Sequence, residues 1–168
     1  DQEEALSISD RVAVMSAGRV EQVATPPEIY GAPATPFVAE FVGTMNRLEA
    51  TVVDGERGRV SYAGREIAAD AVRGRRSGER VLVLIRPEAL AVEALPDGEV
   101  PEGSLVGRVA AQVFLGAVTR LKIETEGGGE LLTADLPSSG ASGFQAGTRV
   151  AARFTPDIPR VLDLLPAR

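Results

Sequence analysis

The spacing of hydrophobic positions changes near residue 46 and divides the chain into two parts. Before that point the pattern is mixed: some short segments have apolar residues at helical spacing, residues 11–15 alternate, and Pro and Gly separate the segments. After it, short segments rich in Val, Leu and Ile alternate with glycine-containing turns, a pattern typical of an all-β barrel or sandwich. We therefore predict a small α/β segment over residues 1–45 and a self-contained, mainly β domain over residues 46–168.

The pattern of the first part predicts a helix over residues 1–9 and then a β-hairpin with strands at 11–15 and 19–23. Two short helices should begin at Thr25 and Thr35, because each Thr can cap a helix whose first position is Pro. Thr25 is followed three residues later by Glu, which completes a capping box.

The helix that begins after Thr35 carries Phe37 and Phe41, which lie four residues apart and share a face. We expect this pair to pack between the two parts of the chain rather than to form an exposed patch.

In the second part the pattern predicts eight strands, at residues 48–53, 58–62, 80–85, 105–115, 118–125, 130–136, 148–154 and 160–165. Leu121 and Ile123 share one strand face while their charged neighbours share the other, so each strand should bury one side, as in a small closed or nearly closed barrel. Phe114-Leu115-Gly116 is predicted to be a core strand and its turn. The three glycines at 127–129 are predicted to be a hairpin turn rather than an anion-binding loop.

Composition removes most kinds of catalytic site. The 168 residues include neither His nor Cys, which excludes disulfides, zinc sites of the usual type and His-dependent nucleophilic triads. The phosphate-binding pattern G-x-x-x-x-G-K-[ST] is absent, and the only lysine is Lys122 on a predicted strand. Glu3 and Glu4 are adjacent, but helical neighbours point about 100° apart, so they indicate a solvated first turn. We predict no catalytic, cofactor or metal site in this chain.

The net charge of −6 argues against a nucleic-acid partner, because an acidic surface repels phosphate backbones. The tight basic cluster of Arg73, Arg75 and Arg76 lies in a glycine-containing segment, and we interpret it as a solvated loop, with an anionic partner as the alternative. The chain has no run of about 18 apolar residues, so no direct membrane insertion is expected.

Arg86-Pro87-Glu88 is the main candidate functional spot in the second part. Pro87 should end the strand before it, because it lacks a backbone donor. Arg86 and Glu88 would then either make a charge-assisted contact inside the domain or reach a partner subunit.

At fixed spacing, the first part resembles the ATP-binding subunits of ABC importers. The residues that carry this resemblance are 1–6, 9–15, 18–20, 22, 25–30, 33 and 37–43. The second part is similar to the OB-like TOBE barrel that follows the ATPase domain in importers of the polyamine, ferric-iron, sulfate and maltose type. The residues that carry this second resemblance are 85–88, 114–116, 119–121, 147–150 and 156–157, so Gly116 and Arg120 join Arg86, Pro87 and Glu88 as motif or interface candidates.

The resemblance implies that residues 1–45 are the C-terminal edge of the ATPase domain and that residues 46–168 are the TOBE domain. In that family the switch histidine, which contacts the ATP γ-phosphate, directly precedes the residue matched by Asp1. The phosphate-binding loop, signature helix and magnesium-binding acids would also lie upstream, so Mg-ATP belongs to the full-length parent. The implied role is regulation and homodimerisation, with transporter membrane subunits as partners, at the cytoplasmic face of the cell membrane.

Two other classes of function stay open. The barrel could bind a small oxyanion, with backbone amides near Ser104 or Ser138-Ser139-Gly140 as donors. It could also be a nucleic-acid-binding OB barrel, which would stack bases on exposed aromatic residues; residues 46–168 offer only four aromatic side chains at near-neutral charge.

Overall fold

The structure is a computed structural model that describes residues 2–95 and 100–164. The chain forms two compact units, Asp1–Met45 and Asn46–Arg168, and the division falls where the hydrophobic pattern changes. The sequence also indicates a turn at Asp97-Gly98; this turn and the expectations that rest on Asp1 and on residue 165 lie outside the described residues.

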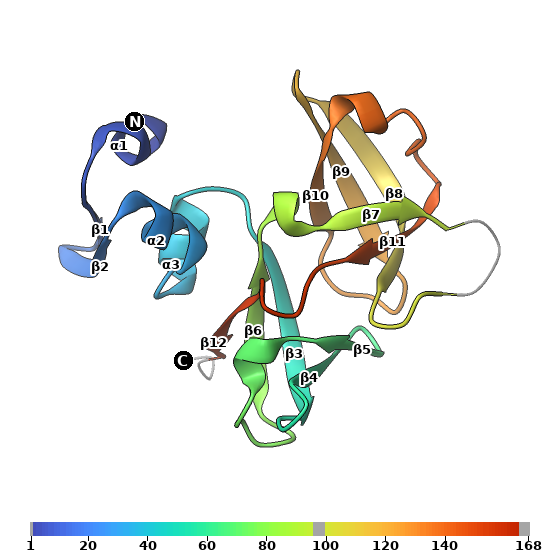
Figure 1. The fold of residues 1–168 in the computed structure, drawn as a ribbon, viewed down its shortest axis with the longest axis horizontal. Coiled ribbons are helices and arrows are strands. Elements are labelled where there is room, and N and C mark those ends of the chain that lie inside the picture. The colour runs from blue at the N-terminus through green and yellow to red at the C-terminus, as the bar shows by residue number, and fades with distance from the viewer. Residues whose placement is uncertain (1, 96–99, 165–168) are drawn as a thin grey trace. The chain divides into compact units, whose positions relative to one another are not determined.

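The first unit consists of a helix, a hairpin and two short helices, in the order that the sequence predicts (Figure 1). Its elements are α1 (Gln2–Ile8), β1 (Val12–Ser16), β2 (Arg19–Ala24), α2 (Pro26–Gly31) and α3 (Pro36–Phe41). Val14 of the hairpin packs with Ile29 of α2 and with Val38 and Val42 of the α3 region to form a small core. A bulge at Val14 and Met15 interrupts the register of the hairpin.

Both predicted caps form at the starts of α2 and α3. The backbone N–H of Thr25 donates to the Glu28 carboxylate at 2.9 Å, and the Thr25 hydroxyl donates to the same oxygen at 2.8 Å. Both hydrogen bonds lower the pKa of Glu28, and the one from the Thr25 backbone N–H has the larger effect. The Thr35 hydroxyl oxygen accepts from the Val38 N–H at 3.3 Å, which satisfies a donor in the first turn of α3.

Phe37 and Phe41 contact each other on α3, and their packing between the two parts of the chain stays a prediction. Their rings stack on each other, with centroids 5.7 Å apart, and the two residues stay 39% and 43% exposed. They are therefore half-exposed side chains that cover one another, a common arrangement for aromatic residues four apart on a helix.

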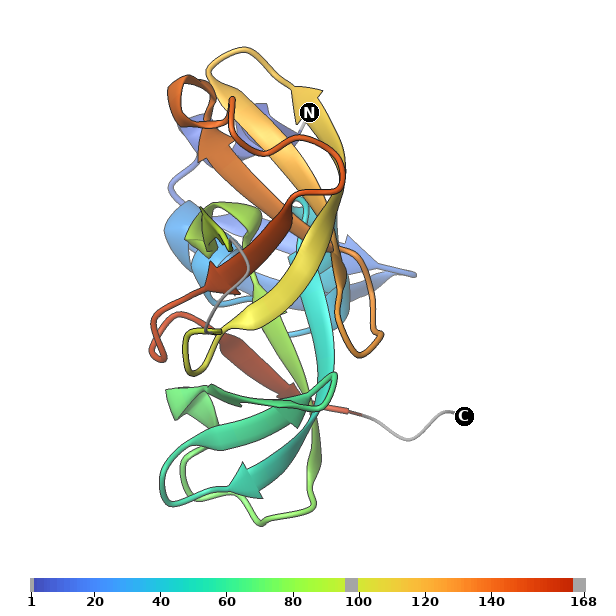
Figure 2. The same cartoon turned by 90° about the vertical axis from the view of Figure 1, so that its right-hand side faces the viewer.

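The second unit is built from two five-stranded antiparallel sheets, one above the other in Figures 1 and 2. The first sheet has the order β12-β6-β3-β4-β5, from β3 (Asn46–Asp54), β4 (Arg59–Tyr62), β5 (Arg65–Ala68), β6 (Arg80–Ile85) and β12 (Arg160–Asp163). The second has the order β10-β9-β8-β11-β7, from β7 (Ala91–Ala94), β8 (Leu105–Phe114), β9 (Val118–Thr125), β10 (Leu132–Pro137) and β11 (Arg149–Arg153). Three 3₁₀ turns complete the unit: η1 (Asp70–Val72), η2 (Pro87–Ala89) and η3 (Ser138–Gly140).

One hydrophobic core joins the two sheets. Leu48, Val83 and Ile85 from the first sheet and Leu121 and Ile123 from the second belong to the same buried cluster. The chain crosses between the sheets after β6 and again after β11, so β3 and β12 flank β6 in one sheet although they stand at opposite ends of the unit. The mainly β, OB-like prediction is confirmed, and so is the inward face of β9 with Leu121 and Ile123.

The sequence pattern did not single out β5 and β7. Each has four residues and lies at the edge of its sheet, so neither shows a long alternation of apolar and polar positions. The predicted turn at 127–129 does connect β9 and β10. An added Cβ at Gly127 would lie 2.3 Å from the Ala63 carbonyl oxygen and one at Gly129 would lie 2.3 Å from the Tyr62 hydroxyl, so close approach, together with positive φ, requires glycine there.

Candidate functional site

Arg86-Pro87-Glu88 forms the corner where the chain leaves the first sheet. Pro87 ends β6 as predicted and begins η2, which packs against β10. Arg86 is buried, with 8% of its surface exposed, whereas Glu88 is exposed. The two charged side chains therefore lie in different environments, and the role assigned to the motif remains a prediction.

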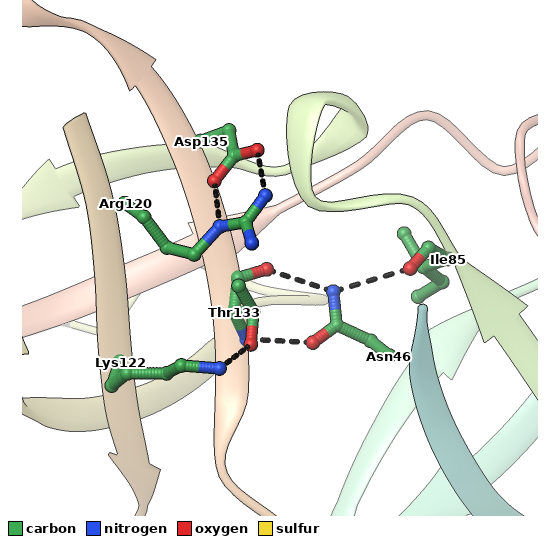
Figure 3. Close-up of polar contacts among 6 residues, drawn as sticks. All are labelled: Asn46, Ile85, Arg120, Lys122, Thr133 and Asp135. Atoms are coloured by element: carbon green, nitrogen blue, oxygen red, sulfur yellow. Dashed lines mark hydrogen bonds and ion pairs between the residues drawn. The ribbon is translucent and has the colours of Figure 1, made fainter. Parts of the chain in front are cut away.

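Arg120 lies on β9 directly opposite Asp135 on β10. Its Nε donates to one carboxylate oxygen of Asp135 and its Nη2 donates to the other, both at 2.7 Å (Figure 3). The side chains are only 28% and 15% exposed, so this is a bidentate, partly desolvated ion pair. The structure thus places the sequence-predicted Arg120 in a cross-strand contact inside the domain.

Asn46, the first residue of β3, joins the two sheets and was not singled out by the sequence. Its Nδ2 donates to the Thr133 carbonyl at 2.8 Å and to the Ile85 carbonyl at 3.2 Å, while its Oδ1 accepts from the Thr133 N–H at 2.6 Å (Figure 3). The amide therefore pairs with edge strand β10 as a neighbouring strand would, and it does so at 3% exposure.

Lys122 extends the contacts around Thr133. Its ammonium donates to the Thr133 hydroxyl at 2.8 Å from the neighbouring strand β9. We use the name Asn46 cluster for the residues that this polar network connects with the adjacent ion pair, namely Asn46, Ile85, Arg120, Lys122, Thr133 and Asp135 (Figure 3). The role of this cluster is structural, because both amide hydrogens and the amide oxygen of Asn46 form hydrogen bonds within the domain.

The sequence pattern around Asn46 could have indicated its structural role. It shares the buried face of β3 with Leu48, Ala50 and Val52, so a polar amide occupies an inward position of an alternating strand. No such pattern indicates the partner of Asp135, because that partner depends on the register of β9 against β10, which the sequence pattern alone does not give.

Gly116 lies in the turn between β8 and β9 with φ of 87°. The Ser138 hydroxyl donates to its carbonyl at 2.7 Å and is also 2.8 Å from the Thr119 hydroxyl, so η3 is tied to this turn. The turn prediction for Gly116 is correct.

The prediction that Phe114 and Leu115 belong to the core is wrong. Phe114 is 74% exposed and Leu115 is 53% exposed, and Val113 and Val118 beside them are also exposed. These four residues surround the tip of the β8–β9 hairpin, and we call them the tip patch. Beyond Val109, β8 extends past its pairing with β11 and has no sheet neighbour on that side among the described residues, so its side chains lose cover on both faces.

The basic cluster at 73–76 is only partly solvated. Arg73 and Arg76 are exposed, but Arg75 donates to Asp163 at 2.6 Å and also pairs with Glu79. The hydrogen bond to Asp163 is the main cause that raises the pKa of Arg75. Arg75 therefore anchors its loop to the C-terminal end of β12.

The backbone amides proposed as oxyanion donors are engaged within the chain. The Ser104 N–H donates to the Pro101 carbonyl at 3.2 Å, and the Ser138 N–H donates to the Ala117 carbonyl at 3.0 Å. These two amides are therefore used within the domain, and anion binding by the other amides near Ser104 and Ser138-Ser139-Gly140 stays a prediction.

Two further groups in the second unit have shifted pKa values. Burial is the main cause that raises the pKa of Tyr62, whose ring lies in the core. Arg149 donates to Glu126 at 2.7 Å, and this hydrogen bond lowers the pKa of Glu126.

Residues 2–95 and 100–164 contain no group of three or more Asp, Glu, His or Cys side chains arranged to hold a metal ion. No helix among these residues has the length and apolar character needed to cross a membrane.

Comparison with known proteins agrees with this geometry. Residues 83–162 match the TOBE domain family. The chain is 41% identical over 159 residues to the spermidine/putrescine import ATP-binding protein PotA of Rubrobacter xylanophilus, covering 92% of this chain and 41% of that protein. It is 45% identical over 127 residues to the sulfate/thiosulfate import ATP-binding protein CysA 2 of Chromobacterium violaceum, covering 76% and 33%. Residues 83–162 are therefore a TOBE domain, and most of the chain is related to the ATP-binding subunits of ABC importers.

The TOBE domain also has a similar solved structure. The cytoplasmic molybdate-binding protein ModG superposes with a TM-score of 0.60 at 15% identity, over 71% of this chain and 96% of ModG, a likeness that concerns the fold. The chain spans less than half the length of the import ATP-binding proteins described above.

Proposed function

We propose that this chain is the regulatory and dimerisation region of the ATP-binding subunit of an ABC importer. The observation that carries the proposal is the relatedness of 92% of the chain, both units included, to a protein named for import and ATP binding. In this proposal the full-length parent hydrolyses Mg-ATP on the cytoplasmic side and contacts membrane subunits, whereas this chain assembles and does not hydrolyse ATP.

The transported solute is left at the level of a class. One relative is named for spermidine and putrescine and another for sulfate and thiosulfate, and the chain shares over 40% identity with both. A region that is similar in importers of a polyamine and of an oxyanion does not select the cargo. We therefore propose uptake of a small solute of the polyamine, iron or phosphonate kind, chosen by other subunits.

The tip patch is the surface that we propose for dimerisation, with a second copy of the chain as its occupant. Val113, Phe114, Leu115 and Val118 expose large apolar side chains together, which is unfavourable in water and typical of contact surfaces. Residues 109–119 contain no charged side chain, whereas the chain as a whole carries −6. Two identical acidic chains repel each other, so an uncharged apolar face is where they can approach at least electrostatic cost.

Sedimentation velocity of the 168-residue chain tests this proposal. We expect a dimer for the wild type, a monomer for the double variant F114S and L115S, and a dimer for V20S, which removes an equally exposed apolar side chain from the first unit. A strict monomer at high wild-type concentration would refute dimerisation. Measurable ATP hydrolysis by the chain would refute the assignment of a non-catalytic region.

Oxyanion binding is the second function that we propose for testing. It is favoured by a cavity lined by Arg59 and Arg153 in the TOBE domain. ModG, which shares the fold, is itself described as molybdate-binding.

A further inference from the structure

A cavity of about 310 Å³ lies in the second unit where three segments meet. Arg59 of β4 and Ala68 of β5 form one wall, and residues 102–103, which precede β8, form another. Residues at the end of β11 and just after it, Arg153, Phe154 and Pro156, complete the lining. Two guanidinium groups therefore line one small, partly open pocket, together with the carboxylate of Glu102 and a few apolar side chains.

The guanidinium of Arg59 is poorly paired for a group in such a place. Among the described residues its ion-pair partner is Glu102 at 3.8 Å, beyond hydrogen-bonding distance, and the Glu102 side chain is 92% exposed. The Arg59 side chain is itself only 33% exposed, so water reaches part of it at most. Among the described residues, its five N–H donors therefore have no hydrogen-bond acceptor within the chain.

Arg153 forms an ion pair through only one edge of its guanidinium group. Its Nη2 pairs with Glu93 on the neighbouring strand β7, and no other hydrogen bond of this side chain occurs among the described residues. The remaining N–H donors can face a second acceptor, since a guanidinium presents parallel donors on more than one edge. The Arg153 side chain is 43% exposed, and Phe154 and Pro156 line the pocket beside it.

We propose that this cavity binds a small dianionic oxyanion of the phosphate or sulfate class, held between Arg59 and Arg153. The proposal deepens the oxyanion function proposed above and rests on it. It places the ligand on guanidinium groups instead of the amides of Ser104 and Ser138. Glu102 competes with the anion, because its exposed carboxylate lies 3.8 Å from the Arg59 guanidinium without a hydrogen bond.

Titration calorimetry of the 168-residue chain tests the site with phosphate, sulfate and molybdate, each at constant ionic strength set with chloride. We expect R59Q and R153Q to weaken binding by at least about tenfold, because each removes charge-assisted hydrogen bonds. E102Q should tighten binding, because it removes the competing carboxylate. R80Q is the matched control: it removes an exposed arginine of the same sheet, paired with Glu49 at 3.1 Å, and should leave affinity unchanged.

The opposing effects of R59Q and E102Q separate a binding site from a structural role, since lost folding would not tighten binding in either variant. Adenosine monophosphate identifies the source of the anion: binding equal to that of phosphate indicates a phosphate carried on a larger molecule, and no binding indicates a free anion. No heat with any anion, or equal affinity in R59Q and R80Q, would overturn the proposal. Sedimentation reports on the tip patch independently, so dimerisation can hold when this site fails.

Discussion

Replacing Asn46 with alanine tests the structural centre of the TOBE domain. The substitution removes the side chain that pairs with both the N–H and the C=O of Thr133 on edge strand β10. A buried polar group that loses its partner costs about 1–3 kcal/mol, and two such groups are left here, so the domain should lose about 2–6 kcal/mol. This is a large share of the roughly 5–15 kcal/mol that stabilises a typical domain.

Urea unfolding followed by far-ultraviolet circular dichroism measures this loss, and amide hydrogen exchange at Thr133 locates it. Glu49→Ala is the matched control, because Glu49 lies on the same strand with an exposed side chain and should change stability by no more than about 0.5 kcal/mol. The reasoning is refuted if Asn46→Ala is no more destabilising than Glu49→Ala, or if the Thr133 amide stays equally protected in the variant.

Three further predictions follow from the same domain. Gly116→Ala should cost about 1–2 kcal/mol in urea unfolding, because alanine must adopt the positive φ of 87°. A double-mutant cycle on Arg120 and Asp135 should give a coupling of about 1–2 kcal/mol, above the value for exposed pairs, because the contact is bidentate and partly buried. Stability should fall as the pH drops below 4.5, the ordinary pKa of a glutamate, because Arg149 lowers the pKa of Glu126 in the folded chain and the unfolded chain therefore takes up the proton first. E126Q should flatten this pH dependence.

Each of these has a control in the same domain. Gly140 has an ordinary φ and open space around it, so Gly140→Ala should be nearly neutral, and an equal loss at both glycines would contradict the conformational argument. A coupling energy near zero would show that Arg120 and Asp135 act independently. Glu124→Gln, at an exposed position of β9, is the control for the acid titration. A slope of stability below pH 4.5 that E126Q leaves unchanged would exclude the Arg149 contact as its cause.

The local elements were predictable because their causes are local. The caps at Thr25 and Thr35 depend on side chains within three residues, and the inward face of β9 follows from the two-residue period of a strand. The order of motifs along the chain likewise indicated the family before any coordinates, and the comparisons confirm it.

The amino-acid sequence was therefore sufficient to predict the mainly β character, most strand positions, the turn at Gly116 and the relationship to importer ATP-binding subunits. The tertiary structure alone decided which residues meet across long separations. Asn46 contacts Thr133 at a distance of 87 positions, and Arg120 contacts Asp135 only in one register of two strands. The predicted burial of Phe114 was wrong for the same physical reason. An apolar residue on a strand is buried only where a neighbouring element covers it, and β8 extends beyond the end of its neighbour β11.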